Sequence, residues 1–391
     1  MVTNHNSDEA IAYIESKLKV VTKADERSQS HLVPLKLWPS QLYYIRNRTN
    51  RDICVKNRQQ GFSTGVMADN ARILFTQPFE RQNIVAHDQD TAEWLFFTVE
   101  RFHRNLSPAE RPKVDWKSGQ RMRFPHLDSY IYVDSAQSEH LSLGRTLTRA
   151  HLSEMSKWPP RQADALYADV SQTVPEHGFI TIEATPKGRN GKFYELYQAA
   201  KKKEVNYKPF FFAWWWDVTC KRQPLEKFEL TNEEKQLIEY VRITDKMELT
   251  TQNIAFRREK IAELHDLFFQ EYPENDTDCW LAGEMSVFDG VSIRNYLQRV
   301  WEGKEDGKYT IWKDVIGTER YVIGVDVASG IREGDYSVAA VLNVKRNEYV
   351  ARLRGRIPPD LFAQELFRLG HKYNDAEIAV ERTGHGHLVL R

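Results

Sequence analysis

Between residues 52 and about 185, short apolar segments alternate with amphipathic helical patterns, and no other feature limits the possible folds as strongly. The short segments are rich in Val, Ile, Phe and Tyr, which is typical of β-strands. Strands that alternate with helices usually pair in parallel, so this order predicts an α/β domain with a largely parallel sheet. The expected strands are 52–56, 83–87, 129–133, 148–152 and 179–183, with amphipathic helices such as 90–103 between them.

A second α/β pattern follows further along the chain. Residues 8–21 and much of 200–275 predict helices, and the mixed stretch 283–318 predicts a connector. Beyond it, YVIGVDVA, SVAAVLNV and EYVARLRGRI predict three strands, PPDLFAQELFRLGHKY predicts a helix opened by prolines, and AEIAVER predicts a fourth strand. This organisation agrees with the roughly two to three domains that a chain of 391 residues allows.

The charge balance excludes a basic field over the whole protein. Lys and Arg together number 55, and so do Asp and Glu, which makes the formal net charge zero. Any contact with nucleic acid must therefore come from local clusters, although a solvated surface explains each cluster as well. The clusters are Lys113, Lys117, Arg121 and Arg123, and then Lys345, Arg346, Arg352, Arg354 and Arg356.

The cysteines and the apolar segments exclude further classes. Cys54, Cys220 and Cys279 are far apart and form no CxxC pair, which argues against a zinc site or a disulfide framework and fits a reducing cytoplasm. No apolar stretch is long enough to cross a bilayer, and the polar N-terminus is not a secretory signal.

The stretch VKNRQQGFST, residues 55–64, stands where a phosphate-binding loop would stand, between a strand candidate and a helix candidate. Such a loop works because backbone N–H groups and a helix N-terminus hold the anion. Gly61 would permit a close approach of the backbone, and Ser63 could offer its hydroxyl to Mg²⁺. The stretch thus predicts a phosphate site, with a simple strand-to-helix turn as the alternative.

The position that usually carries the lysine of a phosphate loop holds Phe62 here. The position of the usual first glycine holds Lys56. The positive charge of the loop must therefore come from Arg58 or Lys56, and we predict that Arg58 carries it.

Three further stretches occur in the order that a nucleotide-driven motor needs. RAHLSEMSKW places Ser153 and Glu154 at the end of a strand, where a carboxylate can polarise the water that attacks a γ-phosphate. ITIEATPKGRNGKFYELY ends another strand near Thr185, whose hydroxyl can sense that phosphate. LWPSQLYYI places Gln41 upstream of the loop, where its amide could contact adenine. An exposed strand end, a Pro/Gly turn and a surface glutamine are the respective alternatives.

Acidic residues stand at the strand ends of the second pattern. GVDVASGIREGDYS contains Asp326 and Asp335, and AVERTGHG contains Glu381. Carboxylates that converge from the strands of one sheet can hold paired divalent metals for phosphodiester cleavage, and oxygen ligands suit Mg²⁺ or Mn²⁺. Carboxylates that merely flank turns are the alternative.

In this combination the sequence resembles the large terminase subunit of tailed bacteriophages and prophages, from about Trp38 to Arg391. RQQGFST is similar to the phosphate loop of that family, HLSEMSKW to its Walker B stretch, and EATPKGRNGKFYELY to its coupling motif. FFQEYPENDTDCWLAGEMSVFD resembles the segment that joins motor to nuclease, and GVDVASGIREGDYS and AVERTGHG resemble the acidic motifs of the nuclease.

The resemblance implies a P-loop ATPase domain with a parallel-rich sheet, followed by an RNase H-like α/β nuclease domain. The implied division is an N-terminal helical extension at 1–35, a motor domain at 36–282 with a helical subregion at 200–282, a linker at 283–318 and an incomplete nuclease domain at 319–391.

The resemblance also implies roles for individual residues. Arg58 would contact the γ-phosphate as a lysine surrogate or as an arginine finger in cis. Glu154 would be the catalytic base, and Thr185 would couple hydrolysis to movement. The nucleotide would be bound by Gln41, Arg58, Gln59, Gln60, Gly61, Phe62, Ser63, Thr64 and Thr185. Metal ions would be bound by Ser63 and by Asp326, Asp335 and Glu381, of which the three acids would also be catalytic.

The function implied is that of a viral DNA-packaging motor subunit in the cytoplasm of a host bacterium. It would hydrolyse ATP to translocate double-stranded DNA into a procapsid and cut the concatemer with a two-metal endonuclease. The cofactors would be ATP and Mg²⁺, with Mn²⁺ as a substitute at the nuclease site. The partners would be double-stranded DNA, a portal protein, a small terminase subunit and further copies of the chain in a ring, without a membrane.

Two departures from the family pattern bear on activity. Ser153 stands where Walker B motifs often have Asp, so Mg²⁺ would be held mainly through Ser63 and waters. The nuclease family also supplies a further Asp beyond its second motif, and no Asp or Glu follows Glu381 in this sequence. We therefore expect this chain to cut DNA poorly or not at all.

Two other functions remain open on the sequence alone. A helicase-like or remodeller-like ATPase would share the first half of the chain but would leave GVDVASGIREGDYS unexplained. A non-catalytic remnant of a decayed prophage would explain Phe62, Ser153 and the position of Arg391.

Overall fold

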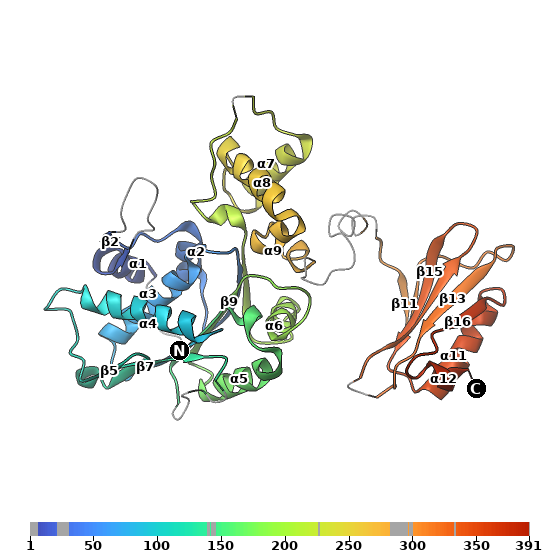
Figure 1. Cartoon of the computed structure of the whole chain (residues 1–391), viewed down its shortest axis with the longest axis horizontal. Helices are drawn as coiled ribbons and strands as arrows, with labels where there is room; N and C mark the ends of the chain where they lie inside the picture. The colour runs from blue at the N-terminus through green and yellow to red at the C-terminus, as the bar shows by residue number, and fades with distance from the viewer. Residues whose placement is uncertain are drawn as a thin grey trace. The chain divides into compact units, whose positions relative to one another are not determined.

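A computed structural model of the chain has two compact units, Met1–Arg294 and Asn295–Arg391 (Figure 1). Each unit has its own sheet and its own buried core. The structure describes residues 7–21, 31–138, 141, 146–225, 227–281, 296, 300–331 and 334–390.

The first unit is built on an eight-stranded sheet with the order β10-β3-β9-β8-β4-β7-β6-β5. The strands from β10 to β7 in this order pair in parallel, and β6 and β5 continue the sheet as antiparallel strands at one edge. The predicted α/β fold with a parallel-rich sheet is therefore confirmed. The strands are β3 (Arg51–Lys56), β4 (Arg81–Ala86), β5 (Trp116–Ser118), β6 (Arg121–Phe124), β7 (Ser129–Ser135), β8 (Arg149–Ser153), β9 (Phe179–Ala184) and β10 (Lys208–Phe212).

Both faces of the central strands are buried, which is why these strands read as continuous apolar runs. Successive side chains of a strand point to opposite faces, so Cys54 joins one core while Ile53 and Val55 join the other. Residues of α1 to α4 cover the first face, and residues of α5 and α6 cover the second. These helices are α1 (Ser7–Lys17), α2 (Pro39–Asn47), α3 (Phe62–Thr76), α4 (Gln89–Arg104), α5 (Pro160–Thr173) and α6 (Lys192–Lys201).

A helical region follows β10 and has a small aromatic core of its own. Its helices are α7 (Asn232–Thr244), α8 (Thr251–Leu264) and α9 (Phe268–Glu271). Trp214, Phe256 and Phe268 are buried together in this core. Glu274, which follows α9, contacts this core. The Glu274 carboxylate accepts hydrogen bonds from Trp214 Nε1 at 3.0 Å and from Arg257 Nε at 2.8 Å.

The second unit has a six-stranded sheet in the order β11-β12-β15-β14-β13-β16. β13 and β16 pair in parallel, and the other neighbours pair antiparallel. Phe362, Leu366 and Leu369 of α11 pack against the sheet, while α12 follows β16. The elements are β11 (Lys304–Asp306), β12 (Tyr309–Ile311), β13 (Tyr321–Asp326), β14 (Ser337–Asn343), β15 (Glu348–Gly355), β16 (Glu377–Val380), α11 (Pro359–Lys372) and α12 (Gly386–Val389).

Three details differ from the sequence predictions. The helix expected at 8–21 ends at Lys17, and β1 (Lys19–Val21) then pairs with β2 (Leu32–Pro34). Helix α1 is also part of the first core rather than a separate extension, since Ala10 and Ile14 are buried there. The expected linker at 283–318 includes β11 and β12, which belong to the second sheet because β12 pairs with β15. The part of the expected linker at 283–295 lies outside the described residues.

Strand β10 was not among the predicted strands. Its aromatic residues lie in a stretch for which the sequence predicts charged helices, yet Phe210 and Phe212 enter the first core at the sheet edge. The two rings stack with their centroids 6.0 Å apart. Aromatic packing against α2 and α3 explains why this segment is extended.

Across the part of the chain that the structure describes, no helix is both long and apolar enough to span a membrane.

Phe62 gives a test of the aromatic packing between α2, α3 and β10. Its ring is 1% exposed and lies 5.1 Å from the rings of both Tyr44 and Phe212, measured between centroids. Phe62→Ala should lower the free energy of unfolding by about 3–5 kcal/mol in urea denaturation, because it removes a buried aromatic ring. Phe97→Ala, at a half-exposed ring on α4, should change it by less than about 0.5 kcal/mol. Equal effects of the two substitutions would contradict the assignment of Phe62 to the core.

Candidate active site

The candidate active site lies where the carboxyl ends of β3, β9 and β8 meet. The loop 57–61 follows β3 and leads into α3, Glu183 lies near the end of β9, and Glu154 directly follows β8. β9 lies between the other two strands, so the three motifs meet at one edge of the sheet. This edge is where open parallel sheets bind ligands.

The loop has a fixed shape that depends on Gln41. Gly61 begins α3 from a left-handed conformation with φ +70°, which favours glycine, and Gln59 has φ 59°. Gln41 donates from Nε2 to the Gly61 carbonyl at 2.7 Å and accepts from the Trp38 N–H at 2.8 Å. A side chain at Gly65 would lie 2.7 Å from Gln41 Cγ. Gln41 thus braces the loop, and its predicted contact with adenine stays a prediction.

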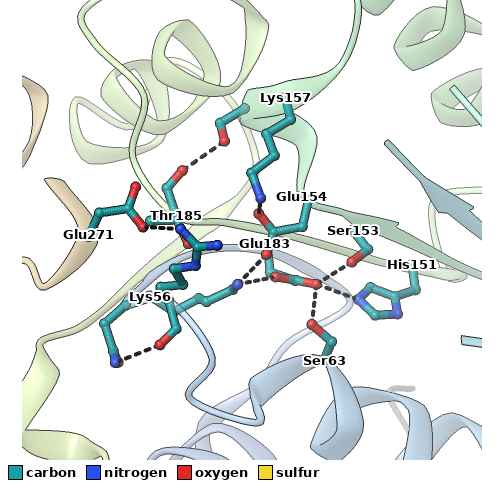
Figure 2. Close-up of polar contacts among 12 residues, drawn as sticks. Lys56, Ser63, His151, Ser153, Glu154, Lys157, Glu183, Thr185 and Glu271 are labelled. Atoms are coloured by element: carbon teal, nitrogen blue, oxygen red, sulfur yellow. Dashed lines mark hydrogen bonds and ion pairs between the residues drawn. The ribbon is translucent and has the colours of Figure 1, made fainter. Parts of the chain in front are cut away.

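The carboxylate of Glu183 is the centre of a buried polar cluster (Figure 2). Its Oε1 accepts hydrogen bonds from Ser63 Oγ and Ser153 Oγ, both at 2.7 Å. His151 Nε2 lies 3.3 Å from the same oxygen, and Lys56 Nζ lies 3.5 Å from Oε2. One carboxylate therefore connects β3, β8, β9 and the first turn of α3.

Lys56 joins Glu183 to Glu154 (Figure 2). Its ammonium donates to Glu154 Oε1 and forms an ion pair with Glu183. The side chain of Lys56 is only 4% exposed, whereas that of Glu154 is 15% exposed and also pairs with Lys157 at 3.1 Å. Lys56, which stands where a phosphate loop usually has its first glycine, is thus the buried cation of the site.

Burial and ion pairing act in opposite directions on these groups. Burial raises the pKa of Glu183, but Lys56 and the donors around it outweigh burial and hold the pKa below its usual value. The same balance lowers the pKa of Glu154, with Lys56 as the main opposing charge. Burial would lower the pKa of Lys56, but the two carboxylates raise it. All three groups are therefore charged near neutral pH.

The turn after β8 holds Glu154 in a strained conformation. Its φ of 50° and ψ of 41° are left-handed, which costs a residue other than glycine about 1–3 kcal/mol. Trp158 Nε1 donates to the Ser153 carbonyl at 3.1 Å, and Ser156 Oγ donates to the Thr185 carbonyl at 2.7 Å. Thr185 is buried, and its backbone carbonyl, which accepts this hydrogen bond, supports the turn that carries Glu154. Strain of this kind concentrates at functional sites.

Arg58 lies on the outside of the loop. Its side chain is 64% exposed and pairs with Glu271 at 3.4 Å. Its backbone N–H donates to the Glu271 carbonyl at 3.0 Å. Arg58 thus connects the loop to α9, and its contact with a γ-phosphate stays a prediction.

The other predicted loop residues differ in exposure. Gln60 is buried and Thr64 is half-buried, while Phe62 points into the core. At position 62 only the backbone can face a ligand, because the ring is enclosed by Tyr44 and Phe212.

Comparison with solved structures identifies the fold. The large terminase of bacteriophage HK97 superposes over 96% of this chain and 74% of its own length, with 14% identity and a TM-score of 0.50. The chain has the fold of a phage large terminase.

Two other structures align with lower TM-scores of 0.39. One is the ATPase domain of the large terminase of Thermus phage P74-26, at 21% identity over 61% of this chain and 99% of that domain. The other is the large terminase of a thermophilic bacteriophage, at 10% identity over 91% of this chain and 80% of that one.

No protein-family profile and no curated protein sequence matches the chain. The resemblance predicted from the sequence is confirmed at the level of fold.

Glu183 is not among the site residues predicted from the sequence. The stretch ITIEATP predicts a role for Thr185 alone. The available signal was a carboxylate inside an otherwise apolar strand whose residues are buried on both faces. Such a charge needs buried partners, and it marks a candidate functional site.

The predicted nuclease acids lie at one edge of the second sheet. Asp326 ends β13 and Glu381 follows β16, the parallel neighbour of β13, with the Glu381 N–H donating to the Val325 carbonyl at 2.9 Å. Asp335 precedes β14, and all three side chains are exposed. Among the described residues, no group of three or more His, Cys, Asp or Glu is arranged to hold a metal. Their role as metal ligands stays a prediction.

Lys56→Met tests the electrostatics of the site. The substitution leaves two buried carboxylates without their shared cation, so it should lower the free energy of unfolding at pH 8 by about 3–5 kcal/mol. In the wild type, the lowered pKa of Glu183 gives stability that is present above about pH 4.3 and is lost below it. Without Lys56, burial raises the carboxylate pKa values, so the variant should gain stability as the pH falls from 8 to 5.

The measurement is chemical denaturation at pH 5 and pH 8. Lys157→Met is the control, because Lys157 is 45% exposed and its ion pair should contribute less than about 1 kcal/mol. A Lys56→Met deficit of the same size at both pH values would show that the two carboxylates do not depend on this lysine.

Proposed function

We propose that this chain is the ATP-hydrolysing subunit of a viral DNA-packaging motor and that it carries a metal-dependent nuclease in its second unit. The observation that carries the proposal is the buried set of Lys56, Glu154 and Glu183 beside a loop that opens a helix, at the carboxyl edge of a parallel sheet. The terminase fold supports the same interpretation.

Phosphate binding would use the backbone of the loop and the N-terminus of α3. The loop N–H groups and the helix dipole favour an anion there. Lys56 supplies the positive charge that Phe62 does not, and its position at the end of β3 makes it rigid. Arg58 remains a candidate for the outer phosphate, since its side chain is exposed and pairs with Glu271 at the rim of the loop.

Glu154 is the proposed base for the attacking water. Of the three charged groups it is the most exposed, and it follows the strand end directly. Its ion pair with Lys56 lowers its basicity, and a bound phosphate would compete for the same ammonium. Binding of ATP would therefore free Glu154 to orient and deprotonate water.

The oxygen donors of the site fit Mg²⁺, which usually keeps several waters and binds one or two protein ligands together with phosphates. Bound with ATP, the ion would neutralise charge that develops on the transferring phosphate. Ser63 at the first turn of α3 is the proposed hydroxyl ligand.

DNA would contact the second unit through Arg354 of β15 and Arg356, which follows the strand. Arg354 and Arg356 are exposed, and their guanidinium groups lie 3.7 and 4.5 Å from the ring centre of Tyr336. In the first basic cluster Lys117 pairs with Glu100 and Arg123 pairs with Asp115, and in the second Arg346 pairs with Glu319. Arg354 and Arg356 are therefore better candidates for phosphate contacts than these ion-paired residues.

The partners proposed are double-stranded DNA, a portal protein, a small terminase subunit and further copies of this chain, in the cytoplasm of a host bacterium. The decisive experiment is an ATPase assay with and without double-stranded DNA. Hydrolysis that DNA stimulates supports the motor. Hydrolysis that DNA does not stimulate counts against the motor, and no hydrolysis supports a decayed remnant.

Glu154→Gln should slow ATP hydrolysis by about 10²–10⁴-fold, because it keeps the size of the side chain and removes the base. Binding of ATP, measured by calorimetry, should persist. Glu176→Gln is the matched control at an exposed acid after α5 and should hydrolyse ATP at the wild-type rate. Turnover of Glu154→Gln within a few-fold of wild type would exclude Glu154 as the base.

Reversal of both Arg354 and Arg356 to Glu should weaken DNA binding and reduce the slope of log affinity against log salt by about 1–2, as expected for the loss of one or two phosphate contacts. The control carries the same change in net charge at Lys202 and Lys235, two exposed lysines of the first unit. Fluorescence anisotropy with labelled duplex DNA over a range of salt concentrations measures both. Unchanged affinity after reversal at 354 and 356 would remove this cluster from the interface.

A further inference from the structure

We infer that Glu183 is the carboxylate that positions the nucleotide-bound divalent cation, supplied from β9 in place of the aspartate that Ser153 does not provide on β8. The inference rests on the proposed ATPase function and assigns a role within that site to a residue outside the predicted set.

The register of the sheet makes the replacement possible. Ser153 and Glu183 are directly paired on neighbouring parallel strands, so their side chains leave the sheet on the same face. The longer side chain of Glu183 reaches back to Ser153 Oγ at 2.7 Å and across to Ser63 Oγ at 2.7 Å. A carboxylate therefore stands beside the loop hydroxyl, although its strand is the neighbour of the expected one.

The direction of the hydrogen bond from Ser63 fits a cation site. The Ser63 hydroxyl donates a hydrogen bond to Glu183 Oε1, which leaves the lone pairs of Ser63 Oγ available to a cation. In metal sites, carboxylates that accept hydrogen bonds from the direct ligands orient those ligands and adjust their charge. In P-loop enzymes the loop hydroxyl and a carboxylate on a nearby strand together hold Mg²⁺.

The local charge also favours a cation. Glu154 and Glu183 are two carboxylates that share the buried ammonium of Lys56. A structural role alone would not require this arrangement, because a neutral side chain at 183 would avoid the cost of burying a second charge, which is several kcal/mol per ion. Once a phosphate draws Lys56 away, a divalent cation would balance the remaining charge of Glu183.

Glu183→Gln provides the test in the full chain. The probe is a non-hydrolysable ATP analogue, whose affinity is measured with Mn²⁺ and again with EDTA. We expect Glu183→Gln to reduce the gain in affinity given by Mn²⁺ by about 10–100-fold, the range for loss of a residue that supports metal ligands. Affinity in EDTA should stay within a few-fold of wild type, and the electron paramagnetic resonance signal of bound Mn²⁺ should weaken in parallel.

Asp52→Asn is the matched control, because Asp52 is a buried carboxylate of β3 at the end of the strand away from the loop. Asp52→Asn should lower the free energy of unfolding and leave the gain in analogue affinity given by Mn²⁺ unchanged. A gain that falls equally in both variants would overturn the inference, since any buried acid would then have the same effect.

The double variant Ser153→Asp with Glu183→Gln returns a carboxylate to β8. Recovery of the gain in analogue affinity given by Mn²⁺ supports the inference. This result counts even if the Glu183→Gln variant alone is too unstable to measure. A folded double variant without recovery, or a Glu183→Gln variant with the full gain, overturns it while the ATPase proposal stands. Failure of the wild type to bind the analogue at all overturns the proposed function and this inference together.

Discussion

The buried ion pair between Lys56 and Glu183 is the interaction on which the candidate site depends. An ionised carboxylate without partners costs several kcal/mol in a protein interior, so its donors must be in place when the site folds. These donors come from α3, β8 and β3. The position of the loop, the turn that carries Glu154 and the end of β9 are consequently fixed as one group.

The same loop is also attached to α9. Arg58 contacts Glu271 through both its backbone and its side chain. Further along, Glu274 is held by Arg257, and Trp280 packs against Phe193 and other aromatic residues of α6. A displacement of the loop on binding of phosphate would therefore reach the segment that leads along the chain toward the second unit.

The main strands were predictable because two buried faces leave a continuous apolar run, as in β3 and β9. The cluster around Glu183 was not, because its partners lie 30 to 127 positions from Glu183 in the chain and no local pattern relates them to it. For Phe62, the local pattern gave a wrong expectation of where the side chain lies. A motif comparison assigns Phe62 to the loop, but the packing of α3 against α2 and β10 places its ring in the core. Local patterns thus predict the sheet and its turns, whereas tertiary packing decides which side chains face the site.

The move of the loop cation from position 62 to Lys56 has a mechanistic consequence under the proposed function. A lysine on the first turn of α3 would contact phosphate without touching the base. Lys56 is instead bonded to Glu154 and to Glu183, so a phosphate can reach its ammonium only by competing with both carboxylates. While the pair is intact, Glu154 is a poor base, because the ammonium holds its pKa down. Under the proposed function, competition from bound ATP would weaken that pair, and the base would become active only when there is a phosphate to attack.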